Sequence, residues 1–175
     1  MGAAVLAGQI AGLCAAAVLM VVYGSLLEEG PLHPLRVLAA FLLGDAALDT
    51  RNLFAPVLGL AFLQGVPVLA WSLVFGLWVN LFEARRGWSL LFLCFTLAIL
   101  AQLVNVDLFA PLWLEGLWGH DLWAEEIPMR WSWLANLAFG MGLMAFPWAY
   151  EVLWGVRPQN WFGRRRTDPV DPLGA

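Results

Sequence analysis

The chain has 175 residues, of which 62% are hydrophobic, 14% aromatic and 13% charged, with a net charge of −4 and a mean hydropathy of +0.76. Soluble domains are about 45–50% apolar and about 25% charged, so these values exclude an ordinary soluble domain and a disordered chain. The two cysteines and the acidic balance also exclude a disulfide scaffold and a nucleic-acid reader.

Long apolar runs separated by short polar clusters predict an all-α, polytopic membrane protein with four transmembrane helices. The first run covers residues 3–27. No basic residue precedes it, and it is longer than the roughly 7–15 apolar residues of a signal peptide, so we expect a retained helix. Gly8 and Gly12 lie one turn apart in this run, a spacing that lets a second helix approach closely. The sequence leaves open whether that helix belongs to this chain or to a partner.

A shorter apolar segment follows at residues 33–44, with the sequence HPLRVLAAFLLG. A membrane span needs about 20 residues, so this segment predicts an interfacial or re-entrant helix. Residues 56–82 form the second predicted span and residues 88–109 the third. Pro67 lies inside the second span and should kink it, because proline removes one helical hydrogen bond.

Residues 111–130 include several charged side chains and are predicted to form a loop on the membrane surface. The fourth predicted span covers residues 131–156, with a kink at Pro147 and with Gly140 and Gly142 as small packing residues. Tryptophan prefers the membrane–water boundary, which predicts a set of interfacial anchors. These anchors are Trp88, Trp113, Trp118, Trp123 and Trp131.

The arginines predict the orientation of the chain. Six of the nine lie in the connection after the second span and in the C-terminal tail, at positions 85, 86, 157, 164, 165 and 166. Positive residues favour the cytoplasmic side, and an even number of spans places both groups on one side. We therefore expect a multi-pass protein of a bacterial inner membrane with both termini in the cytoplasm. Residues 1–156 would form the transmembrane domain and residues 157–175 a polar cytoplasmic tail.

Residues that could carry chemistry are few. No P-loop, nucleophile elbow or paired-cysteine motif is present, so we expect no enzyme. His33 and His120, both predicted near the outer face, are candidates for cofactor binding, with interfacial hydrogen bonding as the alternative. His120 lies among acids that could hold a divalent cation, but their spacing is that of a solvated loop, so we expect no metal. These acids are Glu115, Asp121, Glu125 and Glu126.

Polar side chains inside the spans should face the protein interior or a partner, because burying them in lipid is costly. The acids among them lie near the ends of the spans, which disfavours a proton relay through the membrane. The set comprises Gln9, Gln64, Asn80, Gln102, Asn105, Asp107, Asn136 and Glu151.

Three segments of the chain resemble a loose group of uncharacterised small four-helix bacterial inner-membrane proteins. They are HPLRVLAAFLLG at 33–44, LGL at 58–60 and LANLAFG at 134–140. The resemblance extends over the larger part of the chain and implies a four-helix topology, without implying an activity.

The sequence therefore predicts a non-catalytic accessory subunit, packed against other membrane subunits of a complex in respiratory or photosynthetic electron transfer. A transporter or channel for a small solute is the first alternative, with a path marked by Gln64, Asn80, Gln102 and Asn136. A subunit that binds a pigment or quinone is the second alternative, and lipid, quinone or pigment at the periphery is the expected class of ligand.

Overall fold

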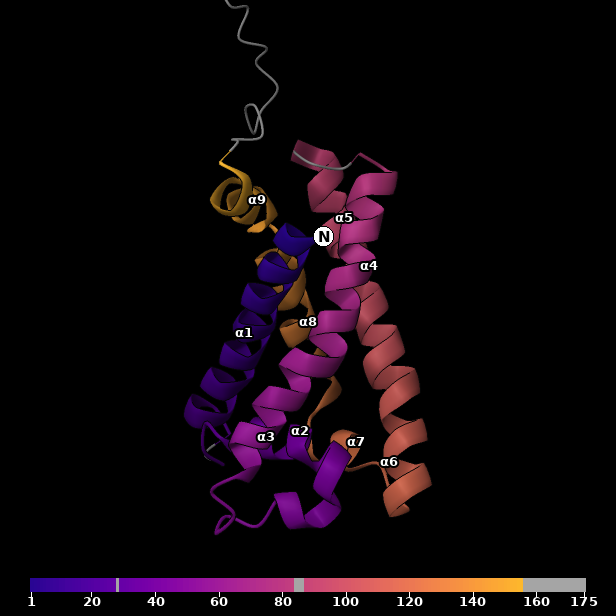
Figure 1. Ribbon diagram of the computed structural model, residues 1–175. Helices are drawn as coiled ribbons and strands as arrows, with labels where there is room; N and C mark the ends of the chain where they lie inside the picture. The colour runs from indigo at the N-terminus through magenta and orange to yellow at the C-terminus, as the bar shows by residue number, and fades with distance from the viewer. Residues whose placement is uncertain (28, 84–86, 156–175) are drawn as a thin grey trace, which may run out of the picture.

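A computed structural model describes residues 1–27, 29–83 and 87–155 of the chain, and within these ranges all regular structure is helical (Figure 1). The predicted all-helical fold is therefore confirmed for the described residues. The predicted tail at residues 157–175 lies outside the described residues, as do the six arginines on which the predicted orientation depends.

Three helices are long and apolar enough to cross a membrane. The first is α1 (Gly2–Ser25), as predicted. The second is continuous over Ala55–Leu81 and consists of α3 (Ala55–Leu63), a π-helical segment η2 (Gln64–Val68) and α4 (Leu69–Leu81). The π-helical segment contains Pro67, whose missing N–H cannot join the usual hydrogen-bond ladder.

The third helix is longer than predicted. It covers Gly87–Trp118 and consists of α5 (Gly87–Ala101), a π-helical segment η3 (Gln102–Phe109) and α6 (Ala110–Trp118). The predicted surface loop at 111–130 is therefore wrong over its first part. Pro111 directly follows η3 within this continuous helix, where the local π-helical hydrogen bonding accommodates its lack of an N–H. Within the rest of the loop, Asp121 caps the short helix α7 (Leu122–Glu126).

The fourth predicted span is divided into two helices. α8 (Met129–Leu143) has 15 residues, and α9 (Phe146–Trp154) begins after a turn. Pro147 lies in the first turn of α9, so it starts a helix instead of kinking one, a position that proline favours. Because α8 is shorter than the roughly 20 residues of a span, the described part of the chain has three candidate spans and not the predicted four.

Four helices nevertheless form a bundle, in which α1 packs against α4 and α8, and α5 packs against the same two helices. The amino terminus and α9 lie at one end of this bundle, and the short helices α2 (His33–Leu43) and α7 lie at the other (Figure 1). The second and third long helices are in contact at α4 and α5 and diverge toward the end that carries α2 and α7.

The glycines of α1 allow this helix to approach the second long helix closely. A Cβ atom on Gly8 would collide with the Oγ of Ser72. A Cβ atom on Gly12 would lie 2.7 Å from the Oε1 of Gln64. Small residues at such contacts bring two helix backbones together in membrane proteins.

The glycines of α8 have the same role on the other side of the bundle. A Cβ atom on Gly140 would lie 2.8 Å from the carbonyl oxygen of Cys94, and one on Gly142 would collide with the Cα atom of Ala11. The small-residue faces of α1 and α8 therefore pack within the chain's own bundle, which resolves the alternative left open by the sequence.

The predicted short helix at 33–44 is present as α2, and eight of its 11 residues are buried. It packs against α1, α3, α6 and α7. Protein therefore contacts α2 on several sides, whereas an interfacial helix would contact protein with one face only. Gly44 ends the helix with a φ of 58°, a left-handed value that glycine adopts without strain, and leads into the 3₁₀ helix η1 (Gly44–Ala47).

Candidate functional site

A cavity of about 270 Å³ lies between the two buried clusters that form the core of the bundle. Its walls are mostly apolar and come from α1, α2, α7, α8 and the second and third long helices. Among the lining side chains are six aromatic rings: Phe41, Phe62, Trp71, Phe109, Trp123 and Phe139. The cavity is thus of the size and character of a site for a small apolar molecule.

The exposed residues among those that line the cavity belong to the second and third long helices. Val66, Ala70 and Val104 line it and are exposed, whereas Ala135 and Phe139 line it and are buried. Val66 and Val104 belong to η2 and η3, so both π-helical segments form the mouth. π-Helical segments often occur at functional sites, because they change the direction of side chains along a helix.

Two amide side chains provide polar groups in the cavity wall. The Oδ1 of Asn105 accepts a hydrogen bond of 3.1 Å from the Nε1 of Trp71, which leaves its Nδ2 group able to donate. The Nδ2 of Asn136 donates to the Oε1 of Gln102 at 2.9 Å and to the carbonyl of Ser132 at 3.1 Å. Of these two amides, Asn105 is therefore the one whose donors make no hydrogen bond within the described residues.

The amides predicted to mark a solute path do not share this cavity. Gln102 is fully buried and bonds to Asn136, and Asn80 is exposed near the end of α4. The side-chain amide of Gln64 packs against Gly12, and within the described residues its nitrogen and oxygen atoms have no hydrogen-bond partner. Of the four predicted path residues, Asn136 alone lines the cavity.

His33 forms a polar cluster at the end of the bundle that carries α2. Its Nε2 lies 3.0 Å from the Oε2 of Glu126 and 3.5 Å from the Oε2 of Glu29. The ring stacks on the buried Tyr23 of α1, with ring centres 5.4 Å apart. The hydroxyl of Tyr23 donates to the backbone carbonyl of Glu126. One tyrosine therefore positions two members of the cluster.

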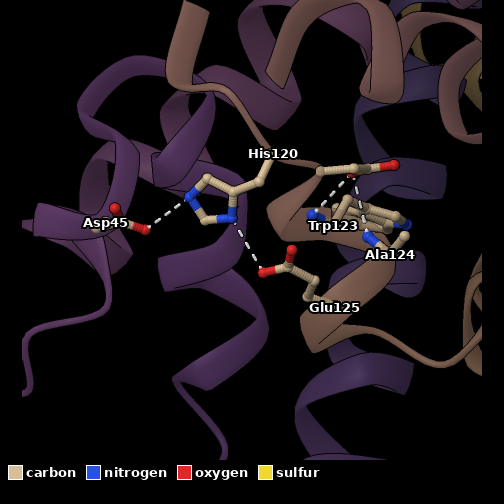
Figure 2. A network of polar contacts seen from close by, with 6 residues as sticks. Asp45, His120, Trp123, Ala124 and Glu125 are labelled. Atoms are coloured by element: carbon tan, nitrogen blue, oxygen red, sulfur yellow. Dashed lines mark hydrogen bonds and ion pairs between the residues drawn. The ribbon is translucent and has the colours of Figure 1, made fainter. Parts of the chain in front are cut away.

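His120 forms a second cluster, shown in Figure 2. Its Nε2 lies 3.2 Å from the Oδ1 of Asp45, and its Nδ1 lies 3.0 Å from the Oε2 of Glu125. The hydrogen bond with Glu125 raises the pKa of His120 above its ordinary value of 6.5, and the charge of Asp45 acts in the same direction. The imidazole thus bridges η1 and α7 from opposite sides of its ring.

The two predicted cofactor candidates therefore contact carboxylates, and neither histidine lines the cavity. Each histidine joins segments that are distant in sequence, and the acids Glu125 and Glu126 of α7 receive one histidine each. Glu29 and Asp45 were not predicted as histidine partners. Asp45 is distant from His120 in sequence and leaves no local spacing pattern, whereas Glu29 lies four residues before His33, a spacing that could have indicated the contact.

The predicted tryptophan anchors lie in different environments. Trp88 is 82% exposed. Trp113 is 40% exposed and donates to the carbonyl of Phe41 at 2.9 Å. Trp123 is only 8% exposed and lines the cavity, so its predicted place at the membrane surface is wrong. Its burial is favourable because its Nε1 donates to the Oγ of Ser132 at 3.0 Å.

The remaining two anchors are partly covered by neighbouring groups. Trp118 packs against Gly44, where a Cβ atom would lie 2.8 Å from the indole ring. The guanidinium of Arg130 lies over the ring of Trp131, 4.9 Å from its centre, as in a cation–π contact.

Comparisons with protein-family models, with curated proteins and with solved structures gave no match to this chain. The function therefore has to be inferred from the cavity and the polar clusters themselves.

Proposed function

We propose that the protein is a non-catalytic membrane subunit that holds a quinone-class molecule in the cavity between its second and third long helices. The observation that carries this proposal is the cavity itself, which is lined by aromatic rings and opens on the apolar outer surface of the bundle. A ligand dissolved in the bilayer would enter sideways through the mouth at Val66, Ala70 and Val104, without crossing water.

The chemistry of the walls favours a flat ring that bears carbonyl groups. Aromatic side chains attract flat conjugated rings through offset stacking and apolar burial. The Nδ2 of Asn105 can donate a hydrogen bond to a carbonyl oxygen, and the Trp71 hydrogen bond to its Oδ1 holds the amide in place. A quinone satisfies both requirements, and its isoprenoid tail would extend from the mouth into lipid.

The test is to measure, by calorimetry, the affinity of the full chain in detergent micelles for a short-tailed ubiquinone. Ala70→Phe places a ring at the exposed mouth and should weaken binding at least about tenfold, because it blocks entry to a preformed pocket. Ala61→Phe is the matched control, since Ala61 is exposed on the same long helix and does not line the cavity. Equal affinity in the two variants would refute the proposal.

A second variant tests the polar contact. Asn105→Leu removes the donor and should weaken quinone binding about fivefold to tenfold. This factor corresponds to the loss of one hydrogen bond worth roughly 1–1.4 kcal/mol. An unchanged dissociation constant would show that the ligand carbonyl does not contact Asn105.

The wider role that we propose is accessory, within a larger complex of respiratory or photosynthetic electron transfer. An exposed stripe on α5 supports it: Trp88, Phe92, Phe95 and Ile99 repeat at intervals of four, three and four residues. This spacing presents one continuous face to a partner helix. Gentle detergent extraction followed by identification of co-migrating subunits tests it, and a chain that migrates alone would contradict it.

A further inference from the structure

We infer that Glu29, His33 and Glu126 form a site for Zn²⁺, in which the imidazole Nε2 and one oxygen of each carboxylate are the ligands. The three ligand atoms lie within 4.8 Å of one another. They come from the connection after α1, the start of α2 and the end of α7, so the ion would join three segments at one end of the bundle.

The distances match the geometry of a tetrahedral ion. Zinc binds histidine nitrogen and carboxylate oxygen at about 2.0–2.1 Å, so two ligands of a tetrahedral site lie about 3.3 Å apart. The observed separations from the Nε2 of His33 are 3.0 Å to Glu126 and 3.5 Å to Glu29. These two separations already fit an ion, the two carboxylate oxygens lie within 4.8 Å of each other and would move toward the ion, and a water molecule would fill the fourth position.

Both carboxylates approach the same ring nitrogen, which makes this cluster different from a simple hydrogen-bonded pair. A neutral imidazole carries at most one proton on Nε2, and one proton cannot serve two carboxylates well. A divalent cation would bind the unprotonated nitrogen and would neutralise both acids.

His120 provides a natural comparison within the same chain. Its two carboxylates, from Asp45 and Glu125, contact opposite nitrogens of the ring (Figure 2). An ion bound at one of these nitrogens is out of reach of the other carboxylate. Two carboxylates therefore converge on one nitrogen of His33 and lie on opposite nitrogens of His120, and chelation is expected at His33.

The surroundings of His33 would hold it in place for a metal. Tyr23 is fully buried, stacks on the imidazole and donates its hydroxyl to the backbone of Glu126. Partners that fix the orientation of metal ligands typically strengthen binding about 10–100-fold. The side chains of His33, Glu126 and Glu29 are 18%, 31% and 51% exposed, so an ion can reach the site from solvent.

The test is a calorimetric titration, in which Zn²⁺ is added to the chelator-treated full chain in detergent micelles. One equivalent should bind, and Glu29→Gln should weaken binding at least about tenfold. Glu29 is half exposed, so this change should leave the fold intact. The matched control Glu125→Gln, one residue from the ligand Glu126, should bind zinc like the parent chain.

Thermal unfolding gives an independent readout. Zinc should raise the unfolding temperature of the parent chain and of Glu125→Gln, and it should have little effect on Glu29→Gln, because a ligand stabilises the state that binds it. Absence of zinc binding, equal binding by Glu29→Gln and the parent, or equal weakening by both substitutions would each overturn the inference.

Discussion

Arg36 anchors the buried helix α2 to the loop that follows it, and its replacement should weaken the fold strongly. The side chain is 8% exposed. Its Nη1 donates to the carbonyl oxygens of Asp49 and Asn52 at 2.6 and 3.0 Å, and its Nη2 donates to that of Thr50 at 3.2 Å. Arg36→Met keeps the length of the stem and removes all three hydrogen bonds.

The size of the effect follows from these contacts. Hydrogen bonds to a charged group contribute about 1.5–3 kcal/mol each, but water can replace part of this at Asp49 and Thr50, which are exposed. We therefore expect Arg36→Met to lower the free energy of unfolding by about 2–4 kcal/mol. Arg51 is exposed in the same loop, so Arg51→Met should change the free energy of unfolding by less than about 0.5 kcal/mol.

The assay is denaturation in detergent micelles, followed by far-ultraviolet circular dichroism, with limited proteolysis of residues 44–54 as a local measure. Arg36→Met should unfold at a lower denaturant fraction than Arg51→Met and should be cleaved faster in this loop. If the two variants unfold together and are cleaved alike, the three hydrogen bonds do not hold the loop and the reasoning fails.

Two other predictions concern packing and pH. Gly59→Ala should destabilise the chain by about 2 kcal/mol or more, because its Cβ would collide with the carbonyl of Leu35. Gly65→Ala, with open space at that position, should be tolerated in the same unfolding assay, and equal effects would contradict the close contact of α2 and α3. His120 has a raised pKa in the folded chain, so its stabilising contact is fully present below about pH 6.5 and is lost as the pH rises through the raised value. The stability difference between the parent and His120→Gln should therefore be larger near pH 6 than near pH 9, and a pH-independent difference would argue against the contacts with Asp45 and Glu125.

The helices were predictable where the apolar pattern that indicates them lies within one continuous stretch of sequence. Apolar length predicted α1 and the helix over Ala55–Leu81, and the short apolar segment predicted α2. The errors occurred around proline. Pro111 was expected in a loop but lies inside the continuous third helix, directly after η3. Pro147 was expected at a kink but lies in the first turn of α9, where the missing N–H is not needed.

The sequence alone predicted helices long and apolar enough to cross a membrane, since an apolar run of sufficient length is sequence information in itself. The tertiary structure decided which polar groups meet. Two long helices separate Glu29 from Glu126 in sequence, yet both carboxylates contact the Nε2 of His33. The cavity likewise is lined by both π-helical segments, which belong to different long helices. Sites of this kind arise from distances between segments, which no spacing along a single chain encodes.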